Sequence, residues 1–499
     1  MKYNSIILIT AACLSLASCG KDFLVETDPN NITSGNFYVS ENDIQSSLFG
    51  AYAVFKDARY ITRQEYFTNS KARQVYYANA GGSGGANVAF WAQSVAPDHT
   101  FIKDRWKSIY SSISRANTVI AHLDDKGISY SSSTLRDTYE AEARFIRAIG
   151  YFYLVTEWGD VPLSLSQITS MSGLNNDYVR APKEKVYQAI YDDCKWIEDS
   201  PLIDLQPKDG CGRASKVAAY VLHGKAALQQ ATDEDFASSK ASLIAESKKA
   251  LEAAWAKKPF GALTEVPFIE AWDVATQKAA RENIFQIDYV GGLQTSYSDF
   301  AKHFRPQEID DKNKEVTPSE SSNDALVMMA DVAEKLFNEA GDIRFEKYMG
   351  KGKDFGVVCY YPLKWADMTV SKSEPYHHNN MVVFRYADVA LMLSEIAYQN
   401  GDNSGAQSYL NMVRNRAGLG NCTATGKDLR DMILKERFRE FIQEGKAWED
   451  MLRLMSKTEI KAYMLADGAD SFGDEDFLFP IPYDQHVLNP EGMWQNPGY

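Results

Sequence analysis

The sequence predicts a mainly α-helical fold, in which TPR-like helix pairs pack with a loop-rich region and a few short strands. Two helix–turn–helix pairs, 212–256 and 386–416, are each near the roughly 34-residue length of a tetratricopeptide (TPR) unit. The stretch 134–158 is apolar on nearly all sides, so it is expected to be buried among other helices. Two further stretches, 291–324 and 350–383, lack helical periodicity and are expected to be long irregular loops, which are uncommon unless they serve a function.

The composition is that of a soluble globular protein with an acidic balance. Apolar residues make up 45% and charged residues 24% of the 499 residues, which are ordinary proportions. The formal net charge of -14 argues against a nucleic-acid partner, because phosphate backbones are bound by a basic surface. Solubility is the simplest explanation of the acidity.

The chain begins with a predicted signal peptide, residues 1–18. Lys2 precedes an apolar core, and small residues follow it. The run Leu-Ala-Ser-Cys at 16–19 resembles a bacterial lipobox, so cleavage before Cys19 would leave a cysteine for acylation. The alternative is an ordinary secretory signal with an incidental cysteine. The remaining chain is expected to form one compact unit from two parts, 19–230 and 231–499.

The N-terminal part is expected to be largely helical. Residues 36–60 and 104–123 show helical spacing, whereas 61–100 reads as a long irregular piece with the glycine run 81–85. In the central helix, Thr134 and Asp137 stand at capping-box spacing. This helix is not a membrane span, because its uninterrupted apolar run is well short of the roughly 20 residues that a bilayer needs.

The C-terminal part alternates helices with a short strand. It is expected to hold a β-like run at 282–289 and a helix at 428–455, whereas the helix expected at 181–199 belongs to the N-terminal part. Charged residues are interleaved with the apolar stripe of the last helix, which allows a catalytic carboxylate pair or a satisfied ion network. We favour the network, since buried charges require partners. The residues are Glu436, Arg437, Glu440 and Glu444.

Four motifs carry a family resemblance. They are CGKDFLVETDP at 19–29, WxxIYxxIxxANxVI at 106–120, EAxxxRAxxYFxLxxxWGDVPL at 142–163 and IxxERxxEFxxEGxxWxDMxR at 433–453. Together with the end FPIP…NPGY, this ordered set resembles the SusD/RagB family of Bacteroidetes outer-membrane lipoproteins. The resemblance implies a helical fold with TPR-like repeats and a loop-rich ligand-binding region. It also implies a lipid-anchored protein at the cell surface, over a SusC-like TonB-dependent transporter.

No catalytic or cofactor motif accompanies these signatures. The sequence has no GxSxG elbow and no HExxH pair. His377 and His378 are adjacent, so in extended chain they point apart and make a poor metal site. The acidic run 467–476 suggests calcium, but it lacks the order of an EF-hand. No cofactor is therefore expected, and a structural calcium ion stays unsupported.

The candidate ligand-binding residues are loop aromatics with polar companions. A sugar ring offers an apolar face to aromatic rings and hydroxyls to polar side chains. The tryptophans in structural signatures or on helices are set aside, and so are Trp272 and Trp494. Two tryptophans in long loops remain, with tyrosines and polar residues of the same loops. The candidates are Trp91, Trp365, Tyr297, Tyr77, Tyr361, Asn87 and Arg73.

The function expected from the resemblance is binding of a glycan and its delivery to the transporter, without enzymatic activity. Two alternatives stay open: a lipid-anchored carbohydrate-active enzyme, and a TPR-like scaffold or binder of a non-glycan nutrient. The sequence names neither the glycan nor the transporter interface. It also leaves open the disulfide state of Cys194, Cys211, Cys359 and Cys422, most of which are expected to be small buried hydrophobes.

Overall fold

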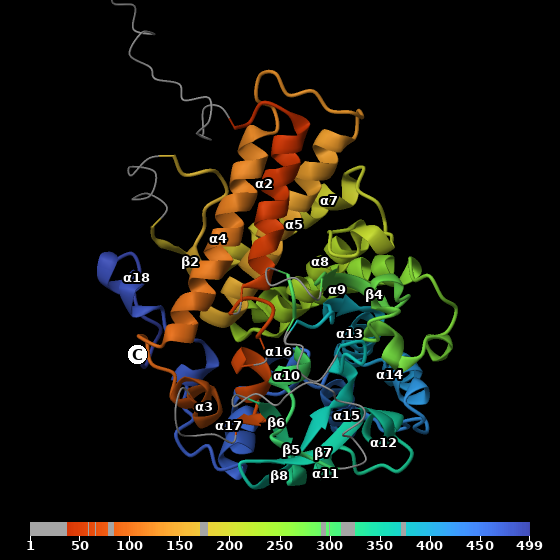
Figure 1. Cartoon of the computed structure of the whole chain (residues 1–499). Coiled ribbons are helices and arrows are strands. Elements are labelled where there is room, and N and C mark those ends of the chain that lie inside the picture. The colour runs from red at the N-terminus through yellow and green to blue at the C-terminus, as the bar shows by residue number, and fades with distance from the viewer. Residues whose placement is uncertain are drawn as a thin grey trace, which may run out of the picture.

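A computed structural model describes residues 37–57, 59–64, 66–77, 84–169, 178–290, 296–298, 300–310, 325–370 and 376–499. The predicted signal peptide and Cys19 lie outside these residues. The chain is mainly α-helical with a few short strands, as the periodicity predicts (Figure 1). Within the described ranges, no helix combines the length and the apolar character that crossing a bilayer requires.

The first helices run side by side in the upper part of Figure 1. They are α2 (Glu41–Ala53), α4 (Thr100–His122), α5 (Leu135–Trp158) and α7 (Lys183–Asp199). Helix α5 is buried along nearly its whole length, as predicted. It ends at Gly159, whose φ of 75° suits glycine. The predicted capping box is wrong, because the Thr134 side chain makes no cap hydrogen bond.

The two predicted helix pairs are present. They are α8 (Lys216–Thr232) with α9 (Lys240–Ala256), and α13 (Tyr386–Gln399) with α14 (Asn403–Arg416). Small residues let the members of a pair approach closely. At Gly224 in α8, an added Cβ would lie 2.5 Å from the Leu251 side chain of α9. A methyl group at position 224 would therefore push the first pair apart.

A five-stranded antiparallel sheet replaces much of the irregular structure expected for 350–383. Its strand order is β1-β6-β8-β7-β5. The strands are β1 (Tyr76–Tyr77), β6 (Leu326–Met329), β8 (Val357–Pro362), β7 (Met349–Asp354) and β5 (Glu308–Ile309). The β-like run at 282–289 is confirmed as β4 (Asn283–Ile287), which pairs with β9 (Met381–Arg385). A last pair joins β2 (Val161–Pro162) to β3 (Arg180–Ala181).

The last long helix predicted, 428–455, is two helices. Helix α15 (Gly426–Glu440) and α16 (Ala447–Leu454) are separated by a break where Gln443 and Gly445 have φ of 53° and 71°. A side chain at position 445 would collide with Gln64, 2.2 Å from its added Cβ. The prediction missed this break because the apolar periodicity continues through it. The chain closes with α17 (Lys457–Ala466) and α18 (Tyr483–Leu488).

Several short helices lie between the longer elements. Helix α3 (Gly84–Ala92) lies in the stretch 61–100 that was expected to be irregular, and a π-helical turn (Tyr66–Ser70) precedes it. The others are α10 (Phe300–His303), α11 (Ala330–Leu336) and α12 (Ile343–Tyr348). A large apolar core runs from α2 to the C-terminal Met493.

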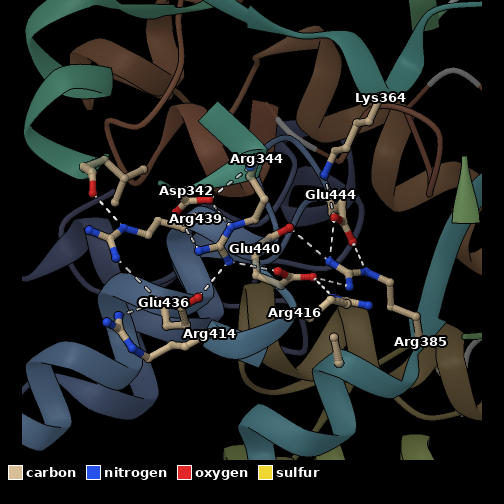
Figure 2. A network of polar contacts seen from close by, with 12 residues as sticks. Asp342, Arg344, Lys364, Arg385, Arg414, Arg416, Glu436, Arg439, Glu440 and Glu444 are labelled. Atoms are coloured by element: carbon tan, nitrogen blue, oxygen red, sulfur yellow. Dashed lines mark hydrogen bonds and ion pairs between the residues drawn. The ribbon is translucent and has the colours of Figure 1, made fainter. Parts of the chain in front are cut away.

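The carboxylates of α15 and of the loop after it form a buried ion network, which confirms the favoured interpretation (Figure 2). Glu440 accepts hydrogen bonds from Arg385 at 2.7 Å and Arg344 at 2.9 Å, and also pairs with Arg416. Glu444 pairs with Arg385 and with Lys364. Cations and carboxylates interlock, so the network fastens α15 to β9, α12 and α14. The carboxylates are occupied by cations, which argues against the catalytic pair.

The four cysteines of the described body are all buried free thiols, as most were expected to be: Cys194, Cys211, Cys359 and Cys422. Burial raises the pKa of the Cys211 thiol to about 11 and that of Cys359 to about 12. Both thiols therefore stay protonated and unreactive at neutral pH.

Candidate functional site

A backbone bridge brings together two segments that the sequence analysis expected to be separate loops. The amide of Ser298 donates to the carbonyl of His377, and the amide of His377 donates to the carbonyl of Ser298, both at 3.1 Å. The residues before each bridge member are Tyr297 and Tyr376. Their rings lie 4.7 Å apart between centroids, at 57°. The bridge thus creates an aromatic pair from segments far apart in the chain.

The alternation of extended chain places Tyr376 and His378 on one side of their segment and His377 on the other. His377 is wholly buried, whereas the His378 side chain is 38% exposed and Tyr297 is 36% exposed. The two adjacent histidines therefore face apart, as expected. We call Tyr297, Tyr376 and His378 the aromatic–histidine cluster.

A buried aspartate orients His378. The Oδ2 atom of Asp367 lies 3.0 Å from His378 Nδ1 and accepts the His378 amide at 2.8 Å. Its Oδ1 accepts from the Thr369 hydroxyl at 2.6 Å and the Thr369 amide at 2.9 Å. Burial alone would raise the pKa of Asp367, but these hydrogen bonds lower it below its usual value. The carboxylate is therefore charged at neutral pH and fixes a proton on Nδ1.

This arrangement can recognise a polyhydroxylated ring. The two tyrosine rings supply flat apolar surface for C–H groups. With Nδ1 bonded to Asp367, the Nε2 atom of neutral His378 is a hydrogen-bond acceptor for a hydroxyl group. The aromatic–histidine cluster thus combines the two kinds of contact that a saccharide needs, and the buried Asp367 carboxylate orients its histidine.

A second aromatic group contains two of the predicted residues, Trp91 and Arg73. The Arg73 guanidinium lies 3.9 Å from the centroid of the Trp91 ring. Tyr76 meets the same ring edge-on, with centroids 5.2 Å apart. Arg73 Nε also binds Asp467 at 2.6 Å, and its φ of 62° is unusual for a non-glycine residue. Arg73 is therefore committed to holding Trp91, which lies on α3 and not in a loop.

Two predicted ligand-binding residues are buried rather than exposed on loops, which disfavours them as ligand contacts. Trp365 is wholly buried and packs against Phe304, with ring centroids 5.9 Å apart. Tyr361 is 1% exposed, and its ring lies over Gly350 of the neighbouring strand. The physical reason is the sheet: β8 and the following turn fold what was expected to be a loop into the core.

The remaining candidates, Tyr77 and Asn87, stay predictions. Tyr77 is the second residue of β1, and Asn87 lies in α3. Their side chains lie outside the described part of the structure. The structure therefore brings together Arg73 and Trp91 of the predicted set, and gives Tyr297 a partner that the sequence analysis had not selected.

Three residues of the candidate site and one exposed tryptophan are absent from the predicted ligand contacts. Tyr376, His378 and Asp367 come together only through the bridge and a hydrogen bond across 11 residues. The alternation of Tyr376 and His378 was the available signal. Trp494, set aside as part of the terminal motif, is 41% exposed, with Arg180 lying 4.8 Å from its ring centroid.

The acidic run 467–476 is largely engaged with protein groups. Asp467 binds Arg73, Asp474 binds Lys461 at 2.6 Å, and Asp476 accepts the Gly473 amide at 2.9 Å. Among the residues that the structure describes, no three histidine, cysteine, aspartate or glutamate side chains are grouped as metal ligands. The run gives no support to a calcium site.

Comparison with known proteins agrees with this fold. A model of the SusD family matches residues 310–499, and a model described as starch-binding associating with outer membrane matches residues 22–228. SusD-like protein P25 of Formosa agariphila is 25% identical over 547 aligned positions that cover 100% of both chains. SusD-like protein P2 of the same organism is 22% identical, over 98% of this chain and 99% of that protein.

Solved structures give the same result for the fold. A SusD homolog from Bacteroides thetaiotaomicron has a TM-score of 0.77 and 19% identity, over 94% of this chain and 99% of that one. Surface glycan-binding protein A of the same organism, in complex with laminarihexaose, has a TM-score of 0.71 and 18% identity, over 92% and 99%. The two family models match separate parts of the chain, one toward each end. The chain belongs to the SusD/RagB family.

Proposed function

We propose that this chain is a cell-surface glycan-binding lipoprotein, which captures a polysaccharide or oligosaccharide and delivers it to a SusC-like TonB-dependent transporter. Family membership supports binding of glycan at the outer membrane, as one matching family model is described as starch-binding associating with outer membrane. One structural neighbour is a laminarin-binding SusD-like protein, and another was solved with laminarihexaose. In this proposal Cys19 carries the lipid anchor.

The observation that carries the proposal is the aromatic–histidine cluster. Two tyrosine rings lie 4.7 Å apart between centroids, next to an imidazole held by a buried carboxylate. This is apolar surface combined with an oriented hydrogen-bond acceptor, which suits a neutral polyhydroxylated ligand better than a charged one. Tyr297 is the one predicted aromatic in this cluster. The Trp91 group is a further candidate contact, with Arg73 holding the ring.

The enzyme alternative keeps one specific observation, the Asp367–His378 pair. In many hydrolases, an exposed histidine that is held by a buried carboxylate acts as the general base. A catalytic role also requires a nucleophile or an activated water on Nε2. We propose binding, because the aromatic pair beside the histidine has an immediate use in binding.

Affinity electrophoresis tests the proposal. The soluble form from residue 22 onward is run through gels that contain laminarin, starch, inulin, xylan, mannan or pectin. Retardation by one polysaccharide is expected, and it should be clearly reduced in the double variant Tyr297→Ala/Tyr376→Ala. Tyr398→Ala, which removes a partly buried tyrosine at the end of α13, is the matched control.

The same samples separate the alternatives. New reducing ends that disappear in His378→Ala would establish the enzyme. Absence of retardation on every polysaccharide would contradict glycan binding and favour a scaffold or a non-glycan nutrient. Co-purification with a SusC-like TonB-dependent transporter from the same organism tests delivery, and it is expected to survive the tyrosine substitutions.

A further inference from the structure

A groove on another part of the molecule has the features of a small-ligand site. It lies between α4, the segment after β2, Tyr178 and the start of α18, and it has a volume of about 350 Å³. Figure 1 shows α4, β2 and α18 along the same side of the molecule. Small-molecule sites in proteins span roughly 300–1,000 Å³. The groove shares no residue with the aromatic–histidine cluster.

The floor of the groove is aromatic and rigid. Trp106 and Tyr110 of α4 line it with ring centroids 5.0 Å apart, and Tyr178 lines it from the other side. The Tyr110 hydroxyl donates to the carbonyl of Pro162 at 2.7 Å. The Tyr178 hydroxyl donates to Gln485 Oε1 at 2.8 Å. Both rings are therefore held in place before any ligand arrives, which lowers the entropy cost of binding.

One donor in the groove is left to solvent. The indole N–H of Trp106 makes no hydrogen bond with a described residue, and its nitrogen is not fully buried. The indole N–H of Trp158, by contrast, donates to the carbonyl of Pro480 at 2.9 Å. Trp106 lines the groove, so a ligand with an acceptor oxygen there would satisfy it.

The rim adds donors and apolar surface. Lys107, Ser114 and Ser166 line the groove with exposed side chains, and Lys107 makes no ion pair with any described residue. Ile168 is 40% exposed, and Leu165 beside this segment is 46% exposed. Apolar side chains thus stand next to hydrogen-bond donors. A purely apolar ligand would leave the Trp106 donor unsatisfied, and a purely polar one would leave the rings uncovered.

We propose that this groove is a second saccharide-binding site, which holds one or two sugar units against Trp106, Tyr110 and Tyr178. The proposal rests on the proposed function for the class of ligand, but it assigns a different place. A sugar ring covers the aromatic floor with its C–H face, and its oxygens accept from the indole, the ammonium and the hydroxyls. Two sites on one chain would raise the apparent affinity for a long polysaccharide, because the second contact is intramolecular.

The test counts sites by isothermal titration. The probe is the hexasaccharide prepared from whichever polysaccharide retards the wild type in the gels, beginning with laminarihexaose. Ser114→Trp fills the groove from an exposed position of α4, and Ser166→Trp fills it from the opposite wall. Ser242→Trp, at an exposed serine of α9, is the matched control.

The expected stoichiometry is two for the wild type and for Ser242→Trp, and one for each groove-filling variant. It is one for Tyr297→Ala/Tyr376→Ala, and zero when that double change is combined with Ser114→Trp. A wild-type stoichiometry of one that neither groove variant changes would overturn the second site and leave the proposed function intact. Absence of any glycan binding by the wild type would overturn both.

Lys107→Ala provides a test that leaves the core untouched, should the tryptophan variants unfold. It removes one rim donor and is expected to weaken the second site roughly two- to tenfold. Affinity at both sites equal to that of the wild type would count against the assignment.

Discussion

Arg385 and Glu444 face each other through two parallel hydrogen bonds, Nε to Oε2 and Nη2 to Oε1, each 2.9 Å long. Both side chains are wholly buried. Arg385 also binds Glu282 at 2.8 Å and Glu440 at 2.7 Å. One guanidinium therefore neutralises carboxylates from three parts of the chain and joins β9 to the loop after α15.

Arg385→Met is expected to destabilise the protein by roughly 3–5 kcal/mol, because it leaves three buried carboxylates short of a cation. Urea unfolding followed by circular dichroism measures the change. Lys427→Met is the control: its ion pair with Asp431 is exposed on both sides, so the change should stay under about 1 kcal/mol. Equal effects of the two substitutions would contradict the role given to Arg385.

Glu339 is expected to make the protein sensitive to acid. Hydrogen bonds from Arg414 and Arg439 lower the pKa of Glu339 to about 2, from an ordinary value of 4.5. Between these values the unfolded chain binds a proton that the folded chain does not, so stability is lost as the pH falls. Glu339→Gln should therefore flatten the fall of the urea midpoint between pH 5 and pH 3. Parallel curves for the two proteins would contradict this.

Lys71 is expected to be a destabilising residue. Its ammonium lies 4.9 Å from the ring centroids of both Trp448 and Phe479. No described carboxylate lies within ion-pair distance of it, and burial lowers its pKa to about 8. Lys71→Met should stabilise the protein at pH 7 by roughly 1–3 kcal/mol, since each pKa unit is worth about 1.4 kcal/mol.

Lys364 is the matched control for Lys71. Burial lowers the pKa of Lys364 to about 8 as well, but its ammonium donates to Glu444 at 2.5 Å. Lys364→Met should therefore destabilise by about 1–3 kcal/mol through the unsatisfied carboxylate. Equal signs for the two methionine variants would refute this account.

The lowered pKa of Lys71 also predicts a pH dependence. Between pH 8 and pH 10, the lysine of the unfolded chain keeps its proton while that of the folded chain loses it. The stability of the wild type should therefore rise relative to that of Lys71→Met over this range.

Asp367 is expected to act as a positioning residue for His378. Asp367→Asn removes the charge that holds the proton on Nδ1, so the population of the Nε2–H tautomer should increase. Nitrogen-15 NMR of the imidazole reports this change directly. Glycan affinity should fall roughly three- to tenfold, as expected for the loss of one hydrogen bond. An unchanged tautomer together with weaker binding would indicate a structural effect alone.

Cys19 is expected to anchor the protein. Cys19→Ala should abolish labelling with a palmitate analogue and release the protein from the membrane fraction, because the chain then has no lipid. The soluble form should keep its glycan affinity. Membrane association that persists without the label would contradict anchoring at Cys19.

The helices could be predicted from the sequence, but the sheet could not. The apolar periodicity of α5 and the paired helices α8–α9 and α13–α14 is local, so it can be read from a short window. Strand β1 pairs with β6, where Tyr76 lies opposite Val327. Such short strands depend on partners far away in the chain, and their own residues carry little alternation.

The candidate site was predictable only in part for the same reason. Reasoning from local composition placed Arg73 near Trp91, and the two are in contact. It also selected Trp365, since nothing in 350–383 shows that the chain turns inward there. Tyr297 was found without its partner, because the bridge between Ser298 and His377 is made by backbone groups that leave no trace in the residue types.

That bridge has a consequence for how the ligand preference of such a protein can change. Its hydrogen bonds are made by backbone groups of Ser298 and His377, so the bridge does not depend on which side chains stand at positions 297 and 376. Substitutions at these two positions can therefore change the ligand-contacting surface while the helical framework stays the same. Exchanging the segments around 297 and 376 between relatives should transfer the sugar preference.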